Sequence, residues 1–538
     1  MTYADLLRPA SQREPMDARQ SRNHAGGYGF PVDRWTRLDR FLVLGSDAPT
    51  YYQSPRELTR EAAGAVVECY REDAARTVER IAEVSVSGRA PRQSPAILAL
   101  ALGAVSDDER TRQLALGALP RVARTASHLF EFVATARGLG KGWGRAMKRA
   151  IAGWYETREP HALALQAVKY RARHGYDHAR LLRTAHPGSG GDSAAGREAL
   201  YRWMVGKSLP GDALPALVTA HERAMASGEP TEWARLAGEH RLPWEALPTG
   251  AMGEAAVWEA MLPHLGLTAL VRNLGQMTKV GALRPLSSAE GIVLERLANR
   301  EALRRARVHP FALLQALAVY RSGRGMRGAG SWEPVASVVA ALDGAFHAAF
   351  GLVEPTGERH LLALDVSGSM GATLMGSPLT AREGSAAMAM ATIAAEERTH
   401  VVGFTAGTSG RGIYGRQAEL TPLPLRRGGT LEEALRVTSG LPFGGTDCAL
   451  PMLHALKRGI PVDVFVVYTD SETWAGAVHP VEALRRYRQQ TGIAAKLVVV
   501  GMTSGGFSIA DPKDGGMLDV VGFDAAAPGV IADFVRGS

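Results

Sequence analysis

The chain contains the stretch Leu361-Leu362-Ala363-Leu364-Asp365-Val366-Ser367-Gly368-Ser369-Met370, in which an apolar run is followed by a carboxylate and two hydroxyls. A short apolar run that ends in polar residues is typical of a fully buried strand in a parallel sheet. Ligand sites of open α/β sheets lie beyond the carboxyl ends of their strands. We therefore expect a central strand that presents Asp365, Ser367 and Ser369 at that edge.

Two later segments have the form needed to complete a site at the same edge. Thr446 follows the glycines of Gly444-Gly445-Thr446-Asp447 at the start of a predicted helix, and Asp470 ends the run Val466-Val467-Tyr468-Thr469-Asp470. Oxygen ligands from Asp, Ser and Thr suit Mg²⁺, and Mn²⁺ or Ca²⁺ would also accept them. The agreement of three separate segments favours a divalent-cation site over the alternative, a buried Asp that caps a helix among incidental serines.

Short β-branched runs alternate with helical segments on both sides of this stretch. Strands are predicted at 360–364, 400–404, 462–468 and 496–500. Such alternation indicates a mostly parallel, doubly wound sheet. We assign residues 356–538 to this α/β domain, with the boundary within 352–357.

The preceding part of the chain reads as one amphipathic helix after another. Helices are predicted at 55–83, 94–104, 107–122, 125–137, 144–156 and 160–174, with a Gly/Ser loop at 187–196. Successive helices with short connections are typical of stacked HEAT-like pairs, although no strict sequence period is present. We assign residues 23–355 to this helical domain and residues 1–22 to an N-terminal tail.

Composition is that of a folded protein with at least two structural units, since 538 residues exceed what one core usually supports. The sequence shows no signal segment and no apolar run long enough to span a membrane. Its two cysteines, Cys69 and Cys448, provide no disulfide framework. We expect a cytoplasmic protein without a membrane partner.

Positive charge is concentrated in the first 355 residues, which carry a net +10 against −2 for the remainder. Arg145 and Lys148 share one side of a predicted helix, and Lys169 and Arg173 are expected one turn apart on another. His186 is expected near the end of a helix capped by Asp177. Cations interleaved with aromatic rings suit RNA phosphates and unpaired bases, while an ordinary solvated helix face is the alternative.

The candidate cation residues resemble the metal-ion-dependent adhesion site of von Willebrand A domains, with its Asp-x-Ser-x-Ser, Thr and Asp elements. The resemblance implies direct ligation by Ser367 and Ser369. It implies direct or water-mediated ligation by Asp365, Thr446 and Asp470. It also implies one open coordination position for a carboxylate from a partner.

Most of the chain resembles the Ro60 (TROVE) family. The resemblance rests on Asn23-His24-Ala25-Gly26-Gly27-Tyr28-Gly29-Phe30, on Leu270-Val271-Arg272-Asn273-Leu274-Gly275, and on 36–46, 58–61, 143–146, 169–170, 365–370 and 444–452. It begins near Asn23, so the first 20 residues have no clear counterpart, and the Gly/Ser loop also departs from the family pattern.

Family membership would imply a monomeric ring of HEAT-like helices closed by the A domain. Y RNA-like small RNAs would bind its basic outer surface, and single-stranded 3′ ends of misfolded RNA would enter its hole. The residues that match the family's Y RNA contacts are Lys169, Arg173 and His186. An RNA could also tether the ring to polynucleotide phosphorylase or another exonuclease, in noncoding RNA quality control and maturation.

Two other functional classes stay open at this point. The helical part could be a scaffold for an A domain that binds partner proteins through its metal. A metal-dependent hydrolase is the third class, but no nearby His base or second carboxylate cluster is evident in the sequence around Asp365 and Asp470. We therefore expect a protein that is not an enzyme.

Overall fold

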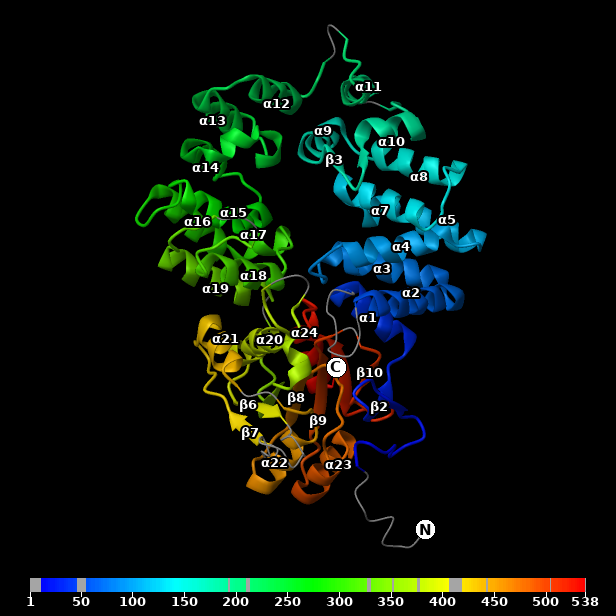
Figure 1. The fold of residues 1–538 in the computed structure, drawn as a ribbon, viewed down its shortest axis with the longest axis vertical. Coiled ribbons are helices and arrows are strands. Elements are labelled where there is room, and N and C mark those ends of the chain that lie inside the picture. Colours follow the sequence, from blue (N-terminus) through cyan, green and yellow to red (C-terminus); the bar gives the residue numbers. More distant parts are fainter. Residues whose placement is uncertain are drawn as a thin grey trace.

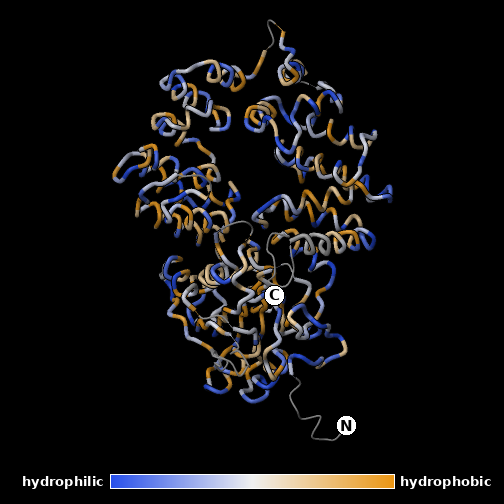
Figure 2. Tube along the Cα trace, viewed as in Figure 1, coloured by the Kyte–Doolittle hydropathy of each residue, from blue (hydrophilic) through white to orange (hydrophobic). Residues whose placement is uncertain are grey.

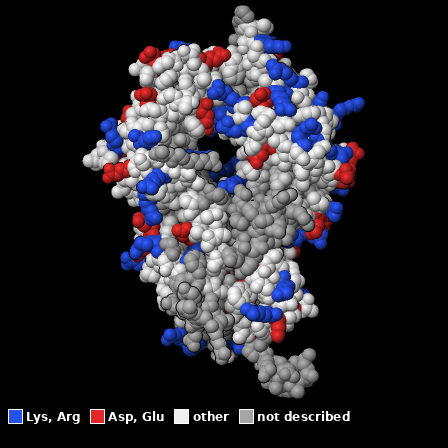
Figure 3. Space-filling model, viewed as in Figure 1, with Lys and Arg blue, Asp and Glu red and all other residues white. Residues whose placement is uncertain are grey.

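The computed structural model describes residues 11–45, 55–191, 194–209, 213–326, 330–350, 353–374, 378–405, 419–441, 444–503 and 505–537. Two arms of helices rise from one α/β unit and enclose an opening (Figure 1, Figure 3). Hydrophobic residues concentrate between stacked helices and at the centre of the α/β unit (Figure 2). The expected combination of a helical ring and an α/β domain is confirmed.

The N-terminal arm runs from the α/β unit to the far end of the ring. Its helices are α1 Arg34–Leu44, α2 Pro55–Glu72, α3 Ala74–Ser87, α4 Ser94–Val105, α5 Glu109–Gly117, α6 Leu119–Val122, α7 Ala126–Gly138, α8 Arg145–Glu156, α9 Pro160–Lys169, α10 His178–Ala185 and α11 Ala194–Met204.

Three of the expected helices in this arm were too long. The helix expected at 55–83 is divided at Asp73, whose carboxylate accepts a hydrogen bond from the amide of Arg76 and so caps α3. The helix expected at 107–122 is divided between α5 and α6, where Pro120 lies in the first turn of α6. The helix expected at 160–174 ends at Lys169.

A hairpin of β3 Ala172–Arg173 and β4 Tyr176–Asp177 replaces the end of that third helix. Its turn residues His174 and Gly175 have φ values of 54° and 77°. Two consecutive positive φ angles match the twist of a tight two-residue hairpin. Arg173 therefore lies on a strand, and the expectation that it shares a helix face with Lys169 was wrong.

The C-terminal arm returns from the far end of the ring to the α/β unit. Its elements are α12 Ala216–Ala226, α13 Pro230–Glu239, η1 Trp244–Ala246, η2 Thr249–Gly253, α14 Ala255–Met261, α15 Leu267–Lys279, α16 Ser288–Ala298, α17 Arg300–Arg305, α18 Pro310–Arg321 and α19 Ala336–Ala349.

The two arms contact each other at both ends of the opening. At the far end, Nζ of Lys169 lies 3.8 Å from Oε1 of Glu245 in η1. Near the α/β unit, His309 Nε2 lies 2.9 Å from the carbonyl oxygen of Arg89. A single chain thus encloses the opening between two inter-arm contacts.

The α/β unit is built on a six-stranded sheet in the order β11-β9-β8-β5-β6-β7. The strands are β5 His360–Asp365, β6 Thr399–Thr405, β7 Glu419–Pro422, β8 Val464–Thr469, β9 Lys496–Gly501 and β11 Met517–Val521. All neighbouring pairs are parallel except β6 and β7. The four expected strands are confirmed, whereas the edge strands β7 and β11 were not expected because they are short and partly polar.

Helices cover both faces of this sheet. They are α20 Ala381–Ala395, α21 Leu431–Ser439, α22 Leu450–Arg458, α23 Pro480–Thr491 and α24 Ala527–Arg536. Leu362 and Leu364 of β5 pack in the core that includes residues of α20 and α24, while Leu361 and Ala363 pack in the core with α22 and α23. Burial on both faces explains why β5 is an uninterrupted apolar run.

The N-terminal segment, residues 11–31, lies against the α/β unit and not in the helical arms. It contains β1 Ser21–Arg22 and β2 Tyr28–Pro31, and β2 pairs with β10 Phe507–Ser508. The part of the expected tail that is described, residues 11–22, is therefore packed on the domain most distant from it in sequence. Within the described residues, no helix combines the length and apolarity needed to cross a membrane.

Arg40 of α1 joins the helical ring to the α/β unit. Its side chain is 2% exposed, and its Nη2 lies 2.8 Å from both carboxylate oxygens of Asp519 on β11. Its Nη1 donates to the carbonyl oxygens of Gly505 and Phe507. The charge is thus desolvated but neutralised, and both terminal nitrogens of the guanidinium are hydrogen-bonded.

We predict that Arg40→Met lowers the free energy of unfolding by about 3–5 kcal/mol, because it leaves the largely buried Asp519 carboxylate without its counter-charge. Urea unfolding of the full chain measures the change. The control is Arg121→Met, which removes an exposed pair with Glu79 and should cost less than about 1 kcal/mol. Equal losses in the two variants would contradict the assigned role of Arg40.

Candidate cation site and nucleic-acid interface

The first part of the candidate cation site is a buried network at the carboxyl ends of β5 and β8. Asp365 accepts hydrogen bonds from the amide of Ser367 at 2.9 Å and from Oγ1 of Thr469 at 2.7 Å. The hydroxyl oxygens of Ser367 and Ser369 lie 3.1 Å apart. Thr469, which is not among the predicted ligands, thereby orients one oxygen of Asp365.

The loop that carries Thr446 reaches the same edge. The amide of Gly368 donates to the carbonyl oxygen of Gly444 at 3.2 Å, which joins this loop to the turn after β5. All five predicted residues are buried here: Asp365 ends strand β5, and the loops at the same edge carry Ser367, Ser369, Thr446 and Asp470. The structure thus brings together the segments that the sequence singled out.

Electrostatic repulsion is built into this edge. Burial raises the pKa of Asp470 to about 7, with further contributions from the nearby carboxylates of Asp365 and Glu472. Burial also raises the pKa of Asp365, against hydrogen bonds that lower it. Two carboxylates desolvated side by side are costly unless a cation neutralises them.

The donor set fits a hard divalent cation. Oδ2 of Asp470 and Oγ of Ser471 are buried and have no hydrogen-bond partner among the described residues. Buried polar atoms without partners are rare and often mark a missing ligand. No group of three or more His, Cys, Asp and Glu suited to a metal occurs among the described residues, so the hydroxyls must supply part of any coordination shell.

The N-terminal segment adds residues that the sequence did not connect with this edge. His24 Nδ1 lies 2.9 Å from Oε1 of Glu472, whose side chain is fully buried. Gln12 hydrogen-bonds to the carboxylate of Asp447, the residue that follows Thr446. Nothing in the sequence around Gln12 or His24 indicates a partner more than 400 positions away.

The predicted RNA-binding residues occupy one end of the N-terminal arm. Arg145 is exposed and Lys148 is half-buried, both in the first turns of α8. His186 is exposed at the C-cap of α10, with a φ of 49°. Arg173 is exposed on β3, and Lys169 is partly buried against Glu245.

Aromatic contacts join the two basic stretches, one around Arg145 and one around Arg173, which are separate in the sequence. The rings of Trp143, just before α8, and Tyr176 on β4 meet edge to face with centroids 6.2 Å apart. The guanidinium of Arg137 lies over Trp143, and that of Arg180 lies 4.5 Å from the centroid of Tyr176. In Figure 3, Lys and Arg side chains gather along the upper rim of the opening, with a few acidic groups among them.

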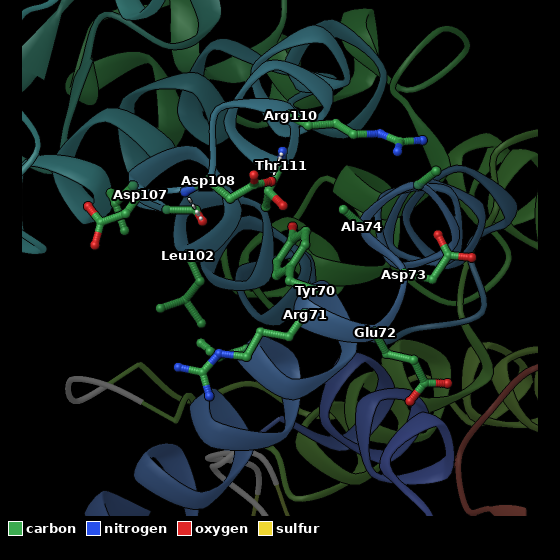
Figure 4. Close-up of a pocket in the computed structure, with 14 residues that line it drawn as sticks. Tyr70, Arg71, Glu72, Asp73, Ala74, Leu102, Asp107, Asp108, Arg110 and Thr111 are labelled. Atoms are coloured by element: carbon green, nitrogen blue, oxygen red, sulfur yellow. Dashed lines mark hydrogen bonds between the residues drawn. The ribbon is translucent and has the colours of Figure 1, made fainter.

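A separate cavity of about 880 Å³ lies between α2, α3, α4 and α5 (Figure 4). Asp73 and Asp108 in its wall are already engaged as helix caps, and Tyr70 donates from its hydroxyl to the carbonyl oxygen of Ala99. Of the described residues that line it, none belongs to the predicted cation or RNA sets. These three polar side chains therefore have structural roles.

The family models that match the chain are a TROVE domain, at residues 21–208 and 233–322, and a Ro60 vWA domain, at residues 359–535. The RNA-binding protein RO60 of Deinococcus radiodurans is 46% identical over 99% of this chain and 98% of its own length. The RNA-binding protein RO60 of Caenorhabditis elegans is 34% identical over 99% of this chain and 92% of its own.

A crystal structure of the Deinococcus radiodurans RO (RSR) protein is similar to this fold with a TM-score of 0.69. The two chains are 44% identical, and the match covers 94% of this chain and all of that one. The matches span both the helical arms and the α/β unit. This chain belongs to the Ro60 family.

Proposed function

We propose that this chain is an RNA-binding protein without catalytic activity of its own. The observation that carries the proposal is the surface formed by the exposed Arg145 and Arg173 and the Trp143–Tyr176 contact, at one end of the N-terminal arm. Arginines attract phosphates, and aromatic rings stack on unpaired bases. The two relatives are named as RNA-binding proteins, and neither their names nor the two family models describe an enzyme.

We further propose that the RNAs are small Y RNA-like noncoding RNAs on the outer surface and single-stranded ends of misfolded RNAs in the opening. The family resemblance supports this choice. Lys169, Arg173 and His186 are the proposed Y RNA contacts, with Arg145 and Lys148 beside them. An exonuclease such as polynucleotide phosphorylase would then be recruited through the bound RNA.

Lys169 and Arg173 should differ in their contributions to RNA binding. Because Arg173 is exposed while Lys169 faces Glu245, Arg173→Gln should weaken binding of a small hairpin RNA more than Lys169→Gln does. Removal of one phosphate-binding side chain should lower the affinity about tenfold and reduce the salt slope by about 1. Glu245→Gln, which removes the counter-charge of Lys169, should act in the opposite direction.

Fluorescence anisotropy titrations at several salt concentrations measure both quantities. The matched control is Arg485→Gln on α23, an exposed arginine of the α/β unit. If Arg173→Gln binds with the affinity and salt slope of the Arg485→Gln variant, the assigned RNA face is wrong.

We propose in addition that the α/β unit binds a divalent cation, with Mg²⁺ as the expected ion, through Asp365, Ser367, Ser369, Thr446 and Asp470. The unpartnered Oδ2 of Asp470 and the two neighbouring buried carboxylates support this proposal. When bound, such a cation would supply positive charge and an open position for an acidic group of a partner protein. The cation-dependent capture of a protein partner is thus the second candidate function of this chain.

The cation should reverse the stability order of wild type and Asp470→Asn. With a chelator present, the variant should unfold at a higher temperature than wild type, because a neutral amide relieves the repulsion with Asp365. With Mg²⁺ at about 100 times its dissociation constant, wild type should gain about 2.7 kcal/mol, and the variant should gain little.

Thermal unfolding with and without Mg²⁺ tests this reversal, and Mn²⁺ and Ca²⁺ are compared in parallel. Asp533→Asn, at an exposed carboxylate of α24, serves as the control and should respond to the cations as wild type does. A wild-type midpoint that is insensitive to all three cations would refute the proposed site.

A further inference from the structure

Gln12 of the N-terminal segment is completely buried between two loops of the candidate cation site. Its Nε2 donates to Oδ1 of Asp447 and to the carbonyl oxygen of Val478, both at 2.7 Å. Its Oε1 accepts from Oγ1 of Thr473 at 2.5 Å and from the amide of Gly476 at 3.3 Å. Both donor hydrogens and both acceptor positions of the amide are therefore in use.

These partners belong to the loop that carries Thr446 and to the loop that carries Asp470. Asp447 directly follows Thr446, and Thr473 lies three residues after Asp470. The backbone of Gln12 adds a hydrogen bond from its amide to the carbonyl oxygen of Gly476. One side chain from the beginning of the chain thus bridges two ligand-bearing loops from its end.

The steric fit around this bridge is tight on both sides. A Cβ added to Gly476 would lie 2.3 Å from Nε2 of Gln12 and 2.4 Å from Oδ1 of Asp447. A Cβ added to Gly27 would lie 2.0 Å from the carbonyl oxygen of Thr473. Glycine at these positions allows the N-terminal segment to press against the 470–479 loop.

We propose that Gln12 is a positioning residue of the cation site, and that the N-terminal segment is an intramolecular clamp that holds the Thr446 and Asp470 loops at the spacing a cation requires. The inference rests on the cation site of the proposed function. Gln12 itself does not touch the cation in this proposal. It acts through the carboxylate of Asp447 and the backbone of the 473–478 stretch.

The physical basis is preorganisation. Without Gln12, Asp447 and Val478 would each lose a buried donor. The two loops would then be joined only by their direct hydrogen bonds, such as those from the amides of Trp474 and Ala475 to the carbonyl oxygen of Thr446, and would be less well ordered before the cation binds. Loss of a group that orients metal ligands typically costs about 10–100-fold in metal affinity. The neighbouring contact of Asn23, which donates to the carbonyl oxygen of Thr473, anchors only one of the two loops.

The test compares Gln12→Met with Arg19→Met in the full-length chain. Arg19 attaches the same N-terminal segment to Asp511, away from both ligand loops. Mn²⁺ is the probe, and its dissociation constant is measured from the electron paramagnetic resonance signal of the free ion. We expect Gln12→Met to raise that constant by about 10–100-fold and Arg19→Met to leave it near the wild-type value.

Hydrogen exchange of the metal-free proteins provides a second readout that does not depend on the cation. Gln12→Met should accelerate exchange in 444–449 and 471–478 and leave the central strands β5 and β8 protected. If Gln12→Met does not fold, Gln12→Asn replaces it, since asparagine keeps a neutral amide but is one methylene too short to bridge both loops.

The outcomes separate the clamp from the cation site on which it rests. If wild type does not bind Mn²⁺, the proposed cation site fails, and the clamp fails with it. If wild type binds and the Gln12 variant binds equally well, the cation site stands and the clamp is refuted. If both variants weaken binding equally, general loosening of the segment explains the effect, and the specific role of Gln12 is refuted.

Discussion

The buried ion pair between Arg40 and Asp519 is the interaction on which the arrangement of the two parts depends. A guanidinium without solvent must be neutralised and hydrogen-bonded, and Arg40 satisfies this need only when α1 docks beside β11. Arg89, on the same arm, forms a second ion pair with Asp524 of the α/β unit. On the other arm, the amide of Leu431 donates to Asp343 of α19. Because both arms end on one α/β unit, the helices surround an opening instead of extending as an open solenoid.

The contacts of Arg40 with the α/β unit lie close to the candidate cation site. Arg40 donates to the carbonyl oxygen of Gly505, and a Cβ added to Gly505 would lie 3.8 Å from the carbonyl oxygen of Asp470. The candidate cation site uses the carboxyl ends of parallel strands, where the backbone leaves the sheet and irregular loops can converge. The N-terminal segment covers part of the same edge. Three segments that are remote in sequence therefore meet where the buried carboxylates lie.

The candidate RNA surface shows how a tertiary contact changes the meaning of a charged residue. Lys169 and Arg173 look equivalent in the sequence, but α9 ends between them. Lys169 faces Glu245 across the two arms, whereas Arg173 projects from a hairpin strand beside Tyr176. The pairing of Trp143 with Tyr176 then joins two basic stretches into one surface. Lys169 therefore links the two arms, whereas Arg173 is exposed and can contact a polyanion.

The sequence by itself determined the elements whose signal is local. The apolar runs of β5, β8 and β9 identified the sheet, and the spacing of Asp365, Ser367 and Ser369 marked its ligand edge, because period and order along the chain encode both. Helix ends were less accurate, since Asp73 and the His174-Gly175 turn compete with the helical pattern within a few residues. Only the tertiary structure decided that Gln12 and His24 reach the loops near Asp470, that Glu245 faces Lys169, and that Trp143 meets Tyr176. The sequence around each of these residues does not indicate its partner. The contacts are favourable only after the chain has folded and the surfaces that carry them are packed together.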